Sequence, residues 1–159
     1  MTVLYSTHRI TLKDLNTLVG TVLKDLYKEA ISNDVFVSGP CYWIYYGMDG
    51  QPDTVFTLDI AIPIQGSLNS ARFASKELPA FKSVSHVHEK DWSTLSDCYG
   101  QIMQFVSSNQ VEMTGECREI YWNIDFEHPE NNLTEVQVGV RLKGLQKPAI
   151  EHLKASTTT

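Results

Sequence analysis

The sequence has no run of about 18 apolar residues, the length that a membrane-crossing helix needs. Its first residues lack the apolar segment and the small-residue cleavage site of a secretory signal. The 3 cysteines cannot all pair within the chain, and none of them forms the CxxC spacing that is typical of a zinc site. These absences predict a cytoplasmic domain with reduced thiols and no cofactor.

Clusters of basic residues are also missing. The 13 Lys and Arg are scattered, 19 Asp and Glu outnumber them, and the net charge is −6 at pH 7. Binding to nucleic acid needs clustered cations that displace counterions from phosphates, so we expect no direct nucleic-acid binding and no membrane partner. His86 and His88 are two residues apart, but no third ligand is close in the sequence, so we expect no metal site.

What the sequence does contain is an internal repeat. At a spacing of 76 residues, a Gly, a Cys, an Ile, a Tyr and an Asp recur between residues 39–49 and 115–125. Residues 55–64 and 133–142 alternate apolar and polar side chains in the same phase, as half-buried strands do. The pattern predicts two tandem units of strand, helix, strand and strand, with repeat one at 3–64 and repeat two at 79–142.

Each repeat has one predicted helix. In the first, leucines and valines recur at helical spacing from residue 12 to residue 26, which predicts one continuous helix ending near Ala30. In the second, residues 92–107 carry a similar stripe, with Asp91 or Ser93 as the cap. The other expected features are strands at 3–9 and 80–88, turns into hairpins at Gly39 and Gly115, a linker at 65–78 and a tail at 143–159 with one helical turn at 149–153.

These units predict an α+β fold. A single domain at 1–142 would form antiparallel sheets related by a pseudo-twofold axis, with helices on one face and a ligand groove on the other. Successive side chains of a strand point to opposite faces, so each strand contributes one set to the helices and one to the groove. We assign to the helix face the apolar residues of 56–64 together with Ile120, Trp122, Ile124 and Phe126.

The groove face then receives the remaining set. It contains one central carboxylate, that of Glu119, with the aromatic rings of Trp43, Tyr45 and Tyr121, and Asp59 faces the same way. A carboxylate among rings loses hydration, so its charged form is costly unless a positive group restores the balance. An organic cation does this, and each ring face adds ~0.5–2 kcal/mol. The sequence therefore predicts a pocket for small, lipophilic cations.

Several stretches also resemble a known family. They are Gly39-Pro40 leading to Ile44-Tyr45-Tyr46, Leu58 to Ile64, Leu78-Pro79-Ala80, His88 with Trp92 and Leu95, and Arg118-Glu119-Ile120-Tyr121. Through them residues 3–142 resemble the GyrI-like effector-binding domains, which are related to the SOUL fold. Those domains occur at the C-termini of AraC-type and MerR-type multidrug regulators and as stand-alone proteins.

The resemblance implies roles for particular residues. Glu119 matches the central acidic residue that meets cationic drugs, and Trp92 lies where an aromatic residue is usual at the start of the second helix. Lys90 departs from the family, which commonly has Gly there. The chain has no room for a helix-turn-helix segment, so the resemblance implies a stand-alone sensor or sequestering module linked to transcriptional regulation.

Two other functions stay open. Some stand-alone relatives hydrolyse reactive cyclopropane-bearing toxins, which gives the alternative that Glu119 activates water while Tyr121 acts as the acid. A protein partner docked on a sheet face is a weaker third hypothesis. Binding is favoured over catalysis because the sequence shows one clear carboxylate and no acid–base pair. It also shows no Ser-His-Asp, Cys-His or phosphate-loop pattern.

Overall fold

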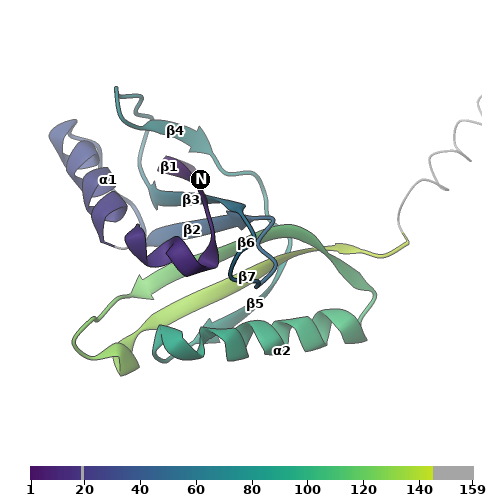
Figure 1. Ribbon diagram of the computed structural model, residues 1–159. Coiled ribbons are helices and arrows are strands. Elements are labelled where there is room, and N and C mark those ends of the chain that lie inside the picture. The colour runs from purple at the N-terminus through teal and green to yellow at the C-terminus, as the bar shows by residue number, and fades with distance from the viewer. Residues whose placement is uncertain (19, 145–159) are drawn as a thin grey trace, which may run out of the picture.

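The computed structural model of the chain describes residues 1–18 and 20–144. Strands predominate, and α1 and α2 lie beside the sheet that the strands form (Figure 1). In chain order the elements are β1 (Thr2–Ile10), η1 (Leu12–Thr17), α1 (Thr21–Ser32), β2 (Cys41–Tyr46), β3 (Phe56–Pro63), β4 (Ala74–Glu77), β5 (Ser83–His88), η2 (Trp92–Thr94), α2 (Leu95–Ser108), β6 (Val111–Asn123), η3 (Pro129–Asn131) and β7 (Leu133–Leu142), where η marks a 3₁₀ turn.

The strands form one antiparallel sheet of 7 strands in the order β4-β1-β3-β2-β6-β7-β5. The α+β class is therefore confirmed. The element orders β1-α1-β2-β3 and β5-α2-β6-β7 are those that the repeat predicts, and β2 pairs with β6 where the two units meet. Duplication and pseudo-twofold symmetry stay predictions. The predicted linker at 65–78 contains a strand, β4, which pairs with β1.

The first helix is broken where the apolar spacing predicts a continuous one. Residues 12–17 form the 3₁₀ turn η1, and α1 begins after Gly20, whose φ of +83° is left-handed. Leucines on both sides of the break pack against the same core, so their spacing could not reveal it. The second helix is confirmed: η2 and α2 cover 92–108, and the Asp91 carboxylate accepts a hydrogen bond from the Ser93 amide.

Gly115 does not mark the start of a hairpin. β6 begins at Val111, and Gly115 lies inside it, with a φ of +92°, at a shift of register between Met113 and Cys117. The Gly115 carbonyl accepts a hydrogen bond from the Gly47 amide at 2.9 Å. This irregularity is a β-bulge, which re-aims the side chains that follow it. The tail's helical turn at 149–153 lies outside the described residues.

Both helices pack on the same face of the sheet. Leu26 and Ala30 of α1 belong to a core cluster with Ile60, whereas α2 packs on a cluster that includes Val136. Residues directly opposite one another in antiparallel strands share a face. The register places Ile60 opposite Trp43, Trp43 opposite Glu119, and Glu119 opposite Val136, in one row across four strands. Glu119 therefore lies on the helix-covered face.

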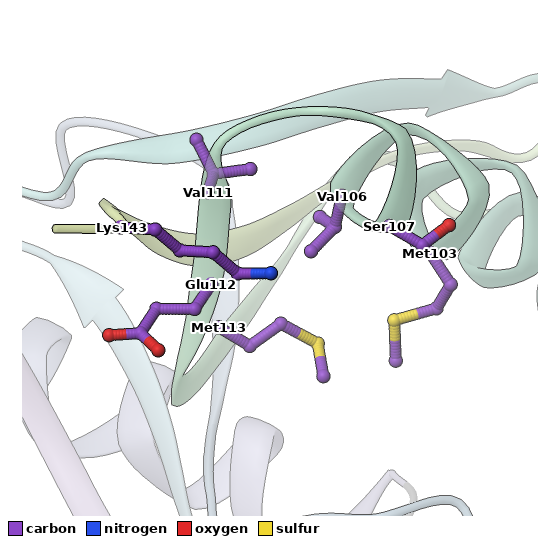
Figure 2. Close-up of a pocket in the computed structure, with 7 residues that line it drawn as sticks. All are labelled: Met103, Val106, Ser107, Val111, Glu112, Met113 and Lys143. Atoms are coloured by element: carbon purple, nitrogen blue, oxygen red, sulfur yellow. The ribbon is translucent and has the colours of Figure 1, made fainter.

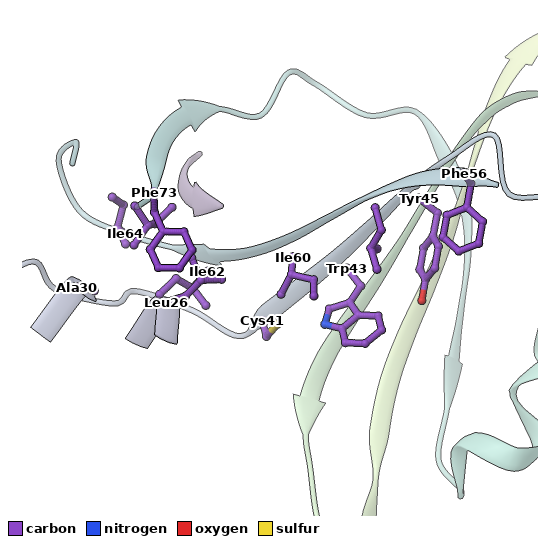
Figure 3. Packing of buried hydrophobic residues seen from close by; sticks show 12 residues of the cluster. Leu26, Ala30, Cys41, Trp43, Tyr45, Phe56, Ile60, Ile62, Ile64 and Phe73 are labelled. Carbon is purple, nitrogen blue, oxygen red and sulfur yellow. The ribbon is translucent and has the colours of Figure 1, made fainter. Parts of the chain in front are cut away.

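This row corrects the predicted faces. Ile120 is buried on the opposite face beside Tyr42, while Trp122 is 52% and Phe126 is 70% exposed rather than packed under a helix. Figure 3 shows Trp43 and Tyr45 on the same side of the strands as Phe56 and Ile60. Alternation tells which residues of a strand share a face but not which face the helices cover. The prediction that the Glu119 face is free of helices was wrong. Within the described residues, no helix has the length and apolar character that crossing a bilayer requires.

Candidate ligand-binding site around Glu119

Glu119 lies near the centre of the sheet and is only 4% exposed. Its carboxylate accepts three hydrogen bonds, and all three donors are tyrosine hydroxyls. Tyr45 Oη donates to Oε1 at 3.0 Å, Tyr121 Oη donates to Oε1 at 2.5 Å, and Tyr99 Oη donates to Oε2 at 2.5 Å. The carboxylate is thus held by hydroxyls from β2, β6 and α2.

The fold explains why these three donors meet. Tyr121 follows Glu119 by two residues, so both side chains point to the same face of β6. Tyr45 lies opposite Cys117, the residue two positions before Glu119, and so it shares that face too. Tyr99 borders the buried stripe of α2, whose packing against β7 brings the phenol over the carboxylate.

The carboxylate is hydrogen-bonded but not neutralised. Burial raises the pKa of Glu119, while the bonds from Tyr121, Tyr99 and Tyr45 act in the opposite direction. None of the ion pairs formed by the described residues includes Glu119. The neighbouring Arg118 points to the other face, where its guanidinium pairs with Glu116 at 3.0 Å. The part of the chain that the structure describes therefore supplies no positive partner to this carboxylate.

The tyrosines are held in their neutral form. Burial, followed by the charge of Glu119, raises the pKa of Tyr45, Tyr99 and Tyr121 well above its ordinary value of 10. Burial and then the same charge also raise the pKa of the Cys117 thiol to about 11. At neutral pH every one of these groups is an uncharged neighbour of Glu119, so none of them competes with a ligand for the role of counter-charge.

Aromatic rings extend from the carboxylate in an edge-to-face series. The ring centroids of Trp43 and Tyr121 are 5.7 Å apart, those of Tyr121 and Trp92 are 5.7 Å apart, and those of Trp92 and Phe126 are 5.8 Å apart. The Trp92 indole is fixed by its Nε1, which donates to Thr134 Oγ1 at 3.0 Å. Trp43 is buried, whereas Trp92 and Tyr121 are partly exposed. The rings therefore lead from solvent to the carboxylate.

Five of the six predicted ligand-binding residues come together: Glu119, Tyr121, Tyr45, Trp43 and Trp92. Asp59 does not join them. It lies opposite Ile44 on the outer face, one position out of phase with the row through Trp43. There its carboxylate accepts hydrogen bonds from Lys76 Nζ at 2.6 Å and Thr7 Oγ1 at 2.5 Å.

Two members of the site were not predicted. Tyr99 was assigned only to the apolar stripe of the second helix, although a tyrosine in a buried stripe needs a partner for its hydroxyl, and that need was the available signal. Phe126 was assigned to the helix packing, and it instead contacts Trp92. It follows β6 after a second register shift, between Tyr121 and Asn123, so alternation could not place it.

Two hollows of the structure lie away from Glu119. One, of about 370 Å³, lies between the end of α2 and the start of β6 (Figure 2). The other, of about 320 Å³, is lined by Lys90, Asp91, Thr94, Pro129 and Glu130. At Glu119 itself, the hydroxyls of Tyr45, Tyr99 and Tyr121 lie against the carboxylate.

Comparison with known proteins identifies a family. The model of the GyrI-like small molecule binding domain matches residues 1–141. No curated protein matches the chain. Among solved structures, the EcmrR C-terminal domain aligns with a TM-score of 0.70 at 17% identity, over 89% of this chain and 92% of that one.

Other solved structures share the fold. EcmrR in a complex with DNA aligns with a TM-score of 0.74 at 17% identity, over 88% of this chain and 54% of that one, so this chain spans about half of it. SAV2435 bound to tetraphenylphosphonium aligns with a TM-score of 0.59 at 12% identity, over 89% and 88%. A hydrolase from Listeria innocua encoded by lin2189 aligns with a TM-score of 0.60 at 14% identity, over 89% and 87%.

Proposed function

Because the chain belongs to the family of GyrI-like small-molecule binding domains, we propose that it binds small, lipophilic organic cations at Glu119. One observation carries the proposal: the carboxylate is buried, and every hydrogen bond that it accepts from the described residues comes from a neutral tyrosine. A buried charge without a partner is unfavourable. A ligand cation supplies the missing partner, so part of its binding energy comes from relief of that cost.

The aromatic series supports the same class of ligand. Trp43, Tyr121 and Trp92 offer apolar ring surface beside the carboxylate, and each ring face that meets a cation adds ~0.5–2 kcal/mol. Contacts with ring faces require little precise orientation of the ligand, so we expect the site to bind a range of cations and not one specific molecule. A delocalised cation with aromatic or alkyl substituents satisfies both the rings and the charge.

Binding requires the tyrosine cover to open. Tyr99 and Tyr121 are partly exposed, whereas Tyr45 is buried, so we expect the two partly exposed rings to be those that turn aside. When a tyrosine moves away, its hydroxyl no longer donates a hydrogen bond to Glu119. The attraction between the ligand cation and the carboxylate replaces that interaction. The tyrosines therefore stabilise the carboxylate by hydrogen bonds in the empty site, and they move away when the ligand binds.

The family and its structural neighbours support a proposed biological role. SAV2435, with the same fold, is bound to tetraphenylphosphonium, and EcmrR, with the same fold, is bound to DNA. We expect this chain to act as a sensor or sequestering module linked to transcriptional regulation. We expect it not to contact DNA itself, because its net charge of −6 repels phosphates.

The test is a calorimetric titration with tetraphenylphosphonium. The isosteric substitution Glu119→Gln removes the charge and retains the shape, and it should weaken binding at least about tenfold, since charged partners in dry sites count for 1.4 kcal/mol or more. Glu89→Gln, an exposed residue between β5 and η2, is the control for net charge and should bind as the wild type does. Equal affinities in all three proteins would remove Glu119 from the site.

A hydrolase is the second candidate. The fold similarity to the Listeria innocua hydrolase and the 2.5 Å contact between Glu119 and Tyr121 favour it. In that function Glu119 takes a proton from water, and the water oxygen bonds to a carbon of the strained ring while a ring C–C bond breaks. Tyr121 gives a proton to the carbon that this bond releases and regains one from Glu119 across their hydrogen bond. The raised pKa of Tyr121 makes this phenol a poor acid, which favours binding over catalysis. Turnover of a cyclopropane-bearing electrophile that Glu119→Gln abolishes would establish hydrolysis, whereas stoichiometric binding without product would exclude that substrate class.

A further inference from the structure

The hollow between α2 and β6 lies apart from Glu119 and has a distinct chemistry. Its volume is about 370 Å³, near the lower end of the 300–1,000 Å³ or so that small-molecule sites occupy. Its residues come from the C-terminal half of α2, the start of β6 and the position directly after β7. They are Met103, Val106, Ser107, Val111, Glu112, Met113 and Lys143.

The lining is apolar and adaptable. Met103 and Met113 are 43% and 44% exposed although both are large hydrophobic side chains. Figure 2 shows them extending into the same space from α2 and β6. Methionine is unbranched and polarisable, and it can follow the shape of varied apolar ligands. Two half-exposed methionines with Val106 and Val111 beside them form a wall that fits an alkyl chain.

The charge at this hollow is positive. Lys143 runs toward its middle, whereas the Glu112 carboxylate turns away from it (Figure 2). Glu112 is also neutralised, because Arg141 Nε donates to its Oε1 at 2.6 Å. Lys143 takes part in none of the ion pairs formed by residues 1–18 and 20–144. An anionic group next to Lys143 would therefore meet a cation that other described residues leave available.

We propose that this hollow, which we call the methionine site, binds anionic amphiphiles with a single alkyl chain, such as medium-chain carboxylates. The chain lies against Met103, Met113 and the two valines, and the head group accepts a hydrogen bond from Lys143 Nζ. Ser107 adds a hydroxyl at the rim. The methionine site thus selects the opposite charge to the one that Glu119 selects, and it stands independently of the cation-binding proposal.

The test uses decanoate and the 4 methionines of the chain as reporters. In protein labelled at the methionine methyl groups, decanoate below its micelle concentration should shift the signals of Met103 and Met113. The signal of Met48, which packs against the core cluster beneath α1, should not shift. Lys143→Glu should weaken decanoate binding about tenfold, as loss of a charge-assisted contact does.

Two controls separate this site from the rest of the molecule. Lys28→Glu makes the same change of charge at an exposed position of α1 and should leave decanoate affinity within about twofold of the wild type, because distant exposed charges are screened. Glu119→Gln should leave it unchanged. Decyltrimethylammonium, with the same alkyl chain and a positive head, should not shift Met103 or Met113.

Several results would overturn the proposal. They are an absence of shifts at millimolar decanoate, equal losses in Lys143→Glu and Lys28→Glu, or shifts that disappear in Glu119→Gln. If Leu153→Asp changes the signals of Met103 and Met113 in the absence of decanoate, the hollow is occupied by the chain's own residues 145–159 and not by a ligand. If the molar mass measured by light scattering halves in Lys143→Glu, a second copy occupies it instead.

Discussion

The two faces of the sheet each bury a carboxylate, and they treat it differently. Asp59 on the outer face is 3% exposed and Glu119 on the helix-covered face is 4% exposed. Asp59 has Lys76 Nζ at 2.6 Å, whereas the donors to Glu119 are three tyrosines. Burial alone therefore does not distinguish the two carboxylates. The charge of the partner does, and under the proposed function the carboxylate without a cationic partner is the one that binds a ligand.

Two cations of the outer face each pair with a carboxylate and also contact an aromatic ring. The Lys76 ammonium lies 4.2 Å from the centroid of the Tyr5 ring as well as beside Asp59. The Arg118 guanidinium lies 4.0 Å from the centroid of the Phe81 ring as well as beside Glu116. Cation–ring contacts thus occur on the outer face between the chain's own groups. At Glu119, on the helix-covered face, aromatic rings and a carboxylate also lie together, but none of the ion pairs of the described residues includes this carboxylate.

The largest effect should come from breaking the outer pair. Lys76→Met leaves Asp59 buried without a counter-charge, and removal of one partner from a buried pair costs about 3 kcal/mol or more. Because the Lys76 side chain is itself 32% exposed, we expect the low end, about 3 kcal/mol, in chemical denaturation at pH 7. Tetraphenylphosphonium binding should be unchanged after correction for the folded fraction.

Lys13→Met is the matched control for that substitution. Lys13 pairs with Asp53 at 3.0 Å, but both side chains are largely exposed, so the loss should be at most about 1 kcal/mol. Equal losses of unfolding free energy in Lys76→Met and Lys13→Met would mean that the pair of Lys76 and Asp59 stabilises the fold no more than an exposed pair does. The proposed difference between the two faces would then be wrong.

An intermediate effect should appear in the pH dependence of cation binding. Burial raises the pKa of Glu119 above 4.5, and the cation binds the charged form, so affinity should rise with pH through the raised pKa and level off above it. Tyr45, Tyr99 and Tyr121 keep their protons across this range because their pKa values lie well above 10. Calorimetry between pH 4 and pH 8 or so measures the midpoint.

Tyr99→Phe sharpens this prediction. It removes one of the three donors that stabilise the carboxylate, so the pKa of Glu119 and with it the midpoint should move to higher pH. A net hydrogen bond of about 1 kcal/mol corresponds to a shift of roughly 0.7 pH units. Glu119→Gln should give a flat profile, and Tyr46→Phe on the outer face should leave the midpoint in place. A midpoint that does not respond to Tyr99→Phe would contradict the role of that hydroxyl.

The sequence predicted this contrast only in part. The repeat and the spacing of apolar residues predicted most strands and helices and brought most of the aromatic residues of the site together, because such spacing depends only on residues that are close in the sequence. The face that the helices cover depends on how α1 and α2 pack, and the phase of β6 depends on the bulge at Gly115, which no alternation pattern encodes. Asp59 and Glu119 were therefore placed together although they are on opposite faces. The partners Lys76 and Tyr99 are distant in sequence from their carboxylates, so neither pair was predicted.

The smallest effect should come from Arg118→Lys on the outer face. Arg118 donates to Glu116 Oε1 from both Nε and Nη2 at 3.0 Å and stacks on Phe81, a geometry that the point charge of lysine does not reproduce. Lysine keeps the positive charge, so the free energy of unfolding should fall by only about 1 kcal/mol. Cation affinity and its pH midpoint should not change, because the guanidinium points away from Glu119 despite being its neighbour in sequence. A change in the midpoint would show that the charge of Arg118 affects the pKa of Glu119 across β6. The charges of the outer face would then contribute to the electrostatics of the Glu119 site.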